Sequence, residues 1–194
     1  MEFCFLGDSR LKEHSKEVSL EDKKYLVSLV DDLTKIVKLT KGIGLSAIQI
    51  GKLDRVFVSN FEGKIVVYIN PEFTYKSLED VIEKEEGCLS IPGVYAKVTR
   101  SNNITLKYYD IDGLEHNDTF TGDMARIIQH EMDHLDGILF IDRLSTTRRA
   151  VIRSKVDLAR KNRQKNIEMF EKISTKLEIA TPVINPVESI QTES

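Results

Sequence analysis

Residues 129–137 of this chain read QHEMDHLDG, a stretch that contains the pattern HExxH. On a helix, residues four positions apart lie one turn apart on the same face, so His130 and His134 can bind one metal ion together. Glu131 would then sit beside a water molecule that the metal activates, and its carboxylate could accept the proton of that water. The alternative is two histidines that cap or line the core. Two of the four histidines of the chain lie here, with Glu in the required place, which favours the metal site.

The helix that carries this pattern is predicted by its own sequence signals. Apolar residues recur at helical spacing from Met124 to Leu135 and mark a buried face. Gly122 opens the segment, and Gly137 is a typical helix stop. The sequence therefore predicts a helix over about residues 122–135, with both histidines in its second half.

A tetrahedral catalytic metal site needs a third protein ligand and one open position. Cys88 is the strongest candidate, because it lies between glycine and a turn-forming stretch in EGCLS, residues 86–90. Its alternative is a small buried hydrophobic residue, the common fate of free cysteine, and Cys4 fits that description. His14 and His116 lie in polar stretches, so we expect them in solvent.

Composition limits the class of protein. The chain has 194 residues, a formal charge of −3 and 41% hydrophobic residues, which indicates one globular domain with its own core. Two cysteines exclude a disulfide scaffold, and near-neutral charge argues against a general nucleic-acid binder. No apolar run approaches the roughly 18 residues of a transmembrane helix, and the start resembles neither a secretory signal nor a transit peptide. We therefore expect a reduced, cytoplasmic protein without a membrane segment.

The remaining pattern predicts an α+β fold. A helix is expected from Glu21 to Leu39, with Ser19 as its N-cap. Short strands are expected at 55–58, 65–69 (ended by Asn70-Pro71), 94–99, 104–109, 114–120 and 138–141, and residues 79–86 form another strand or an extended arm. A last helix begins near Ser145 and reaches Phe170, and residues 171–194 are expected to form a mobile tail. The expected architecture is small antiparallel or mixed sheets around the metal-binding helix, with helices near both ends of the chain.

Three segments, in this order, resemble the patterns of the peptide deformylase family. They are GIGLSAIQ at residues 42–49, EGCLS at 86–90 and QHEMDHLDG at 129–137. Ser46 stands where the family usually has alanine, and Gly7-Asp8 replaces the family's proline before an aspartate. The resemblance covers about residues 1–170, which it implies to be one catalytic domain.

The resemblance implies the residues that carry out the chemistry. It implies three metal ligands: Cys88, His130 and His134. It implies Fe²⁺ as the ion in the cell, with Zn²⁺, Ni²⁺ or Co²⁺ as replacements. It implies Glu131 as general base and acid, and Gln49 and the backbone N–H of Leu89 as donors to the developing oxyanion. The implied reaction hydrolyses the N-formyl group of formyl-methionine on nascent polypeptides and releases formate.

The resemblance also implies how the substrate is bound. Ile43, Gly44 and Gly87 would supply backbone contacts to an extended peptide, as in the addition of a strand to a free edge. Ile43 and Ile127 would line an apolar pocket for the methionine side chain. For Ile127, plain core packing is an equal alternative, because residues on a helix face are more often core than pocket.

Two charged residues on the motif helix have open roles. Arg126 could pair with Glu85 or Glu86 and orient the segment of Cys88, or it could be solvated. Asp133 could accept a hydrogen bond from a ligand histidine, or it could pair with a nearby basic group.

The expected last helix is strongly basic. Residues 148–165 hold eight basic residues and one acidic residue, a local charge of +7, so the rest of the chain carries −10. The ordinary interpretation is a solvated helix face, and the functional one is contact with ribosomal RNA. The competing classes are a metallopeptidase, a non-catalytic RNA-binding module and a structural zinc site. Cys88 argues against a metallopeptidase, because such enzymes seldom use a cysteine ligand. The presence of Glu131 argues against a non-catalytic module. The lack of a fourth ligand near the motifs argues against a structural zinc site. We expect a monomer.

Overall fold

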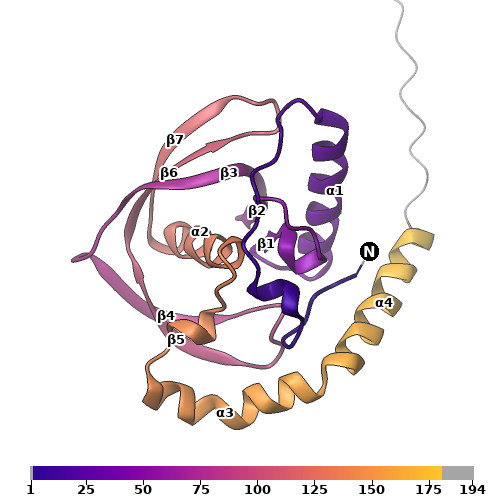
Figure 1. The fold of residues 1–194 in the computed structure, drawn as a ribbon, viewed down its shortest axis with the longest axis vertical. Coiled ribbons are helices and arrows are strands. Elements are labelled where there is room, and N and C mark those ends of the chain that lie inside the picture. The colour runs from indigo at the N-terminus through magenta and orange to yellow at the C-terminus, as the bar shows by residue number, and fades with distance from the viewer. Residues whose placement is uncertain (1, 181–194) are drawn as a thin grey trace, which may run out of the picture.

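The computed structural model describes residues 2–180. Helix α2 (Gly122–Leu135) lies at the centre, between two antiparallel sheets that both contact it (Figure 1). The larger sheet has the strand order β1-β2-β3-β6-β7, and the smaller one pairs β4 with β5. The strands are β1 (Gly44–Ser46), β2 (Val56–Phe61), β3 (Lys64–Lys76), β4 (Val81–Gly87), β5 (Tyr95–Ser101), β6 (Asn103–Tyr109) and β7 (Glu115–Thr121). The α+β prediction is confirmed.

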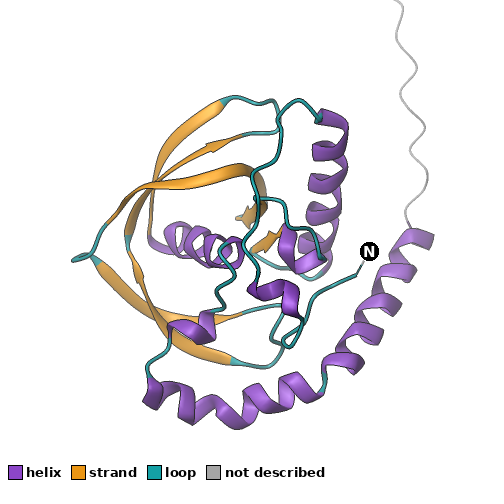
Figure 2. Ribbon diagram, in the orientation of Figure 1, coloured by secondary structure: helices purple, strands orange, loops and turns teal. Residues whose placement is uncertain are grey.

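Helices frame this arrangement on its other sides (Figure 2). The longer ones are α1 (Lys23–Leu39), α3 (Thr146–Lys161) and α4 (Arg163–Ala180). Short 3₁₀ helices span Ser9–Lys12, Ala47–Ile50 and Phe140–Arg143. Among the described residues, no helix has the length and apolar character that crossing a membrane requires.

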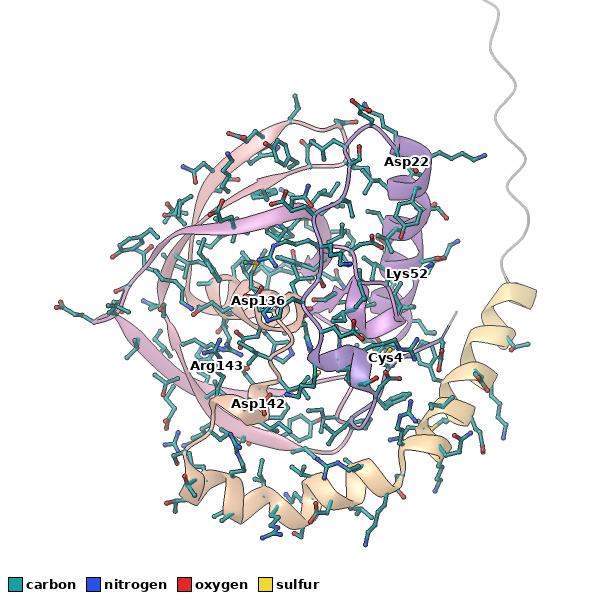
Figure 3. The ribbon with its side chains drawn as sticks, viewed as in Figure 1. Cys4, Asp22, Lys52, Asp136, Asp142 and Arg143 are labelled. Carbon is teal, nitrogen blue, oxygen red and sulfur yellow. The ribbon has the colours of Figure 1, made fainter. Side chains whose placement is uncertain are left out.

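Helix α1 starts two residues later than the sequence predicts. The Asp22 carboxylate, at the head of the helix in Figure 3, accepts a hydrogen bond from the Tyr25 N–H at 3.1 Å and is the N-cap. Ser19 accepts instead from the N–H of Glu21 at 3.3 Å, in the turn before the helix. The prediction of Ser19 as the N-cap was wrong. Serine and aspartate are both favourable N-cap residues, and the turn before the helix places Asp22 at the cap position.

Strand β3 continues through Asn70 and Pro71, where the sequence predicts its end. Its pairing with β6 shifts register between Ile69 and Glu72, so the two residues form a bulge. Proline lacks an N–H, and a bulge is where a missing ladder bond is tolerated. Asn70 takes a φ of 49°, and its side-chain amide donates to and accepts from the backbone of Val18, at 2.9 Å each. These bonds join β3 to the segment that precedes α1.

Residues 138–141 do not form the predicted strand. They lead into the 3₁₀ helix Phe140–Arg143. The Asp142 carboxylate accepts a hydrogen bond from the Leu139 N–H at 2.9 Å, which closes a turn that an extended chain could not make. Leu139 and Phe140 are each 1% exposed, so the apolar run reflects burial and not strand formation.

The C-terminal region forms two helices where one was predicted. α3 ends at Lys161, and Asn162 separates it from α4. α4 continues past Phe170 to Ala180, so the predicted boundary at residue 170 falls inside a helix. The rest of the predicted tail, residues 181–194, lies outside the described residues. Phe170 packs against Phe3, with 4.6 Å between ring centroids, and this contact joins α4 to the N-terminal segment.

Candidate metal centre and substrate cavity

Cys88, His130 and His134 come together in one cluster, in which one potential ligand atom from each lies within 4.8 Å of the others. The histidines lie one turn apart on α2, and Cys88 directly follows the last residue of β4. The Sγ atom of Cys88 lies 3.2 Å from Nε2 of His134, across 46 residues of sequence. Within residues 2–180, no fourth His, Cys, Asp or Glu joins this group, which is the pattern of a catalytic site and not of a closed structural one.

The donor set fits a transition-metal ion. Thiolate and imidazole donors suit Fe, Co, Ni and Zn and are poor ligands for Mg²⁺ or Ca²⁺. Burial lowers the pKa of His134 well below its usual value, so this ring is neutral, which is the form that binds metals. Its Nδ1 atom is buried without a hydrogen-bond partner. The three residues therefore form a preformed set of ligands that is half-buried at Cys88 and His130 and buried at His134.

Glu86 is the carboxylate that contacts a histidine of the cluster. Its Oε2 lies 3.2 Å from Nδ1 of His130, and its carboxylate also pairs with Arg100 and Arg126. Burial alone would raise the pKa of Glu86, but the hydrogen bonds from His130 and Arg100 lower it to about 2. Glu86 is thus an anion that orients the His130 ring. In an extended chain, residues two positions apart point to the same side, so Glu86 and Cys88 face the same way. This spacing is the sequence signal from which a contact between Glu86 and a ligand histidine could have been predicted.

Asp133 does not contact a ligand histidine. Its carboxylate pairs with Arg100 and with Arg143, which Figure 3 labels near the end of α2. Of the two alternatives for Asp133, pairing with basic groups is therefore correct. Arg126 pairs with Glu86 at 2.5 Å, as one of its two readings expected.

Glu131 is 3% exposed and points toward the β1 strand. Its Oε2 lies 2.5 Å from the Ser46 hydroxyl oxygen. A Cβ atom on Gly44 would lie 2.5 Å from its Oε1, so only glycine leaves room for the carboxylate there. Burial raises the pKa of Glu131 above its ordinary value, although His130 and Ser46 act in the opposite direction. A carboxylate with a raised pKa is suited to take up and return a proton near neutral pH.

Gln49 lies beside the cluster and is 2% exposed. Its Nε2 donates to the Ser90 hydroxyl at 3.1 Å and lies 3.7 Å from the Cys88 sulfur. Its Oε1 accepts from the Ser46 N–H at 2.9 Å, which fixes the amide so that the NH₂ group faces the cluster. Cys4, by contrast, is fully buried in a hydrophobic cluster and does not join the three candidate ligands, and burial raises its pKa to about 11.

A cavity of about 840 Å³ opens in front of the cluster. It is lined by nine of the ten predicted site residues: Ile43, Gly44, Gln49, Gly87, Cys88, Leu89, Ile127, His130 and Glu131. The tenth, His134, lies behind the wall and is 1% exposed. Phe3, Phe5 and α4 supply a part of the wall that was not predicted, because contact between the N-terminal segment and α4 leaves no local pattern in the sequence.

An α+β fold that presents an HExxH helix, a cysteine and a buried carboxylate to one cavity defines a metal-dependent hydrolase. Residues 1–150 match the family model described as polypeptide deformylase. A peptide deformylase of Pseudothermotoga lettingae is 46% identical over 151 residues, which is 78% of this chain and 86% of that protein. The chain belongs to the peptide deformylase family.

Solved structures agree with this assignment. The peptide deformylase of Thermus thermophilus superposes with a TM-score of 0.76 at 35% identity, covering 83% of this chain and 98% of that one. A peptide deformylase of Plasmodium falciparum gives a TM-score of 0.78 at 34% identity, covering 84% and 98%. The activity is therefore metal-dependent removal of the N-formyl group from nascent polypeptides.

Proposed function

We propose that Cys88, His130 and His134 hold one metal ion, which is Fe²⁺ in the cell and can be replaced by Zn²⁺, Ni²⁺ or Co²⁺. The observation that supports this assignment is the convergence of the three donor atoms within 4.8 Å beside a buried glutamate. When bound, the ion supplies Lewis-acid chemistry at the end of the cavity that Glu131 faces. The cysteine sulfur makes the site soft and, with ferrous iron, sensitive to oxygen.

Glu131 moves the proton in this proposal. It takes a proton from the attacking water while the water oxygen bonds to the formyl carbon. It then gives a proton to the leaving nitrogen as the C–N bond breaks, which yields formate and a free amine. Gln49 Nε2 and the Leu89 N–H donate to the carbonyl oxygen as it gains negative charge. Removing one such donor typically costs about 3 kcal/mol of transition-state stabilisation.

The peptide would bind along the free edge of β1. This strand pairs with β2 on one side, and no described strand pairs with its other side. Backbone groups of Ile43 and Gly44 there, with Gly87 opposite, can bind an extended formyl-methionyl chain. Ile127 is 5% exposed and belongs to the cavity wall, which supports its pocket role over plain core packing.

The basic C-terminal region, residues 146–170, is proposed to dock on ribosomal RNA. Arg153, Lys155, Arg160 and Lys161 are all exposed on α3. Clustered, exposed cations are what phosphate contacts require. Ribosome co-sedimentation should fall sharply when these four are changed to glutamine, and unchanged binding would refute the docking. A fitting control is Lys38→Gln on α1, which removes an exposed cation outside this region.

The proposal extends to the oligomeric state and the cellular location of the enzyme. One chain supplies every residue of the proposed site, which supports a monomer. A nascent-chain substrate supports a cytoplasmic location, beside the ribosome.

The proposed function is tested by formate release from formyl-Met-Ala by protein reconstituted anaerobically with Fe²⁺, Zn²⁺, Ni²⁺ or Co²⁺. We expect turnover that differs between metals and no release of acetate from acetyl-Met-Ala. Equal rates with iron and zinc would contradict the metal assignment. Cleavage of the Met-Ala bond would indicate a peptidase instead.

A further inference from the structure

Ser46 connects the β1 strand to the proposed general base. It is the last residue of β1, is fully buried, and lies 85 residues before Glu131 in the sequence. Its hydroxyl oxygen lies 2.5 Å from Oε2 of Glu131 and 3.1 Å from the main-chain oxygen of the same residue.

The backbone of Ser46 is held independently of its side chain. Its N–H donates to Gln49 Oε1 at 2.9 Å, and β1 pairs it with Phe57 of β2. The hydroxyl therefore projects from a fixed frame toward Glu131. Removing the hydroxyl would leave the strand, the Gln49 amide and the metal ligands in place, which makes Ser46→Ala a clean probe.

A hydroxyl can suit both proton states of its partner. It has one proton to donate and two lone pairs to accept. When Glu131 is ionised, the hydroxyl donates to Oε2. When Glu131 carries the proton taken from water on its other oxygen, which faces the substrate, the Ser46 hydroxyl still donates to Oε2, and that proton remains available for the leaving nitrogen. The Ser46 hydroxyl therefore keeps Oε2 as its partner in both states.

We propose that Ser46 is a positioning residue that holds the Glu131 carboxylate in one rotamer throughout the proton transfers of the reaction. This proposal rests on the assignment of Glu131 as general base. A carboxylate held in place spends more of its time at the geometry of proton transfer, and this gain appears in the chemical step and not in substrate binding. Gly44, which leaves space for the other carboxylate oxygen, and Ser46 then bracket Glu131 from the same strand.

The test compares wild type, Ser46→Ala and Ser46→Thr as nickel-loaded holoenzymes on formyl-Met-Ala. For Ser46→Ala we expect kcat to fall roughly 10- to 150-fold, the loss typical of a hydrogen bond to a charged group, with KM changed less than about twofold. Ser46→Thr keeps the hydroxyl and should recover most of kcat. Nickel content and the ligand-field absorption of the cobalt-loaded forms should be unchanged, because Ser46 contacts no proposed ligand.

Ser59→Ala is the matched control. Ser59 is also fully buried and pairs with Gly44 across the sheet, but its hydroxyl contacts Tyr68 at 3.4 Å and not Glu131. Its kcat should equal that of wild type. A wild-type kcat in Ser46→Ala would overturn the proposal, and so would an equal loss in Ser59→Ala. An inactive wild-type holoenzyme would instead refute the proposed function, so the two failures are distinguishable.

Discussion

Glu86 and His130 lie at hydrogen-bonding distance, with 3.2 Å between a carboxylate oxygen and the ring Nδ1 atom. The carboxylate reaches the ring from β4, the strand that also leads to Cys88. One strand end therefore supplies both a proposed ligand and the group that orients another ligand. Asp133, although closer to the histidines in sequence, binds Arg100 and Arg143 instead.

This relationship predicts that Glu86→Gln weakens the metal site. The loss of a carboxylate behind a ligand histidine typically costs about 10- to 100-fold in metal affinity or activity. Competition of a chelator with the zinc-loaded protein measures the affinity. Asp133→Asn is the control, because it removes a charged partner of Arg100, the arginine that Glu86 also binds, without touching His130. Equal affinity losses in both variants would show that the ion-pair network, and not the contact to His130, supports the site.

Glu131→Gln is expected to retain metal and lose activity. The amide cannot accept the proton of water, so formate release should fall about 100- to 10,000-fold. Metal content of the purified protein and initial rates on formyl-Met-Ala provide the two readouts. Activity within a few fold of wild type would remove Glu131 from the proposed mechanism.

Cys88→Ala should abolish tight metal binding, because two histidines alone leave the ion with half of a tetrahedral ligand set. Metal analysis after gel filtration measures the loss. Cys4→Ala provides the comparison: Cys4 is fully buried in a hydrophobic cluster and is not one of the three proposed ligands, so its loss should reduce thermal stability and leave the metal content unchanged. Full metal occupancy in Cys88→Ala would contradict the ligand assignment.

Gly44→Ala should lower kcat by displacing the general base. The added Cβ would lie 2.5 Å from Glu131 Oε1, closer than any real contact allows, so the carboxylate must move. Gly63→Ala serves as control, because its Cβ would meet nothing within 4 Å and its cost is backbone strain alone. A drop in melting temperature without a drop in kcat for Gly44→Ala would show that Glu131 tolerates the displacement.

Asp8 predicts a pH-dependent contribution to stability. Hydrogen bonds from Arg10, and then from Arg163, hold the pKa of its carboxyl well below the usual 3.8, although burial acts the other way. A lowered pKa in the folded state stabilises it above pH 3.8, and this contribution is lost as the pH falls below that value. Asp8→Asn should cost about 1–2 kcal/mol at pH 7, since solvent screens the partly exposed arginines.

Urea unfolding of wild type and Asp8→Asn at several pH values measures this difference. The gap in unfolding free energy should narrow progressively below pH 3.8. A gap that stays constant down to pH 2.5 would show that the aspartate acts only as the helix cap of residues 9–12 and not through its charge.

Much of the proposed site could be predicted from the sequence, because its key residues lie close together in the sequence at characteristic spacings. The i, i+4 histidines need only a helix to share a face, and amphipathic periodicity predicted that helix. The extent of α1 and most strands followed from the same kind of periodicity. The failures lie where two candidates of equal propensity compete, as with Ser19 and Asp22, or where burial produces an apolar run without a strand, as at residues 138–141.

The sequence by itself determined the α+β class, the helix that carries His130 and His134, and the types of residue at the proposed site. Only the tertiary structure decided which partners meet: Cys88 with His134, Glu86 with His130, and Ser46 with Glu131. It also placed α4 and the N-terminal phenylalanines along the cavity. The physical reason is that hydrophobic periodicity in the sequence shows only which face of a single helix or strand is buried. The choice of one carboxylate or hydroxyl over another depends on how a strand end crosses a helix, and burial then makes that pairing obligatory.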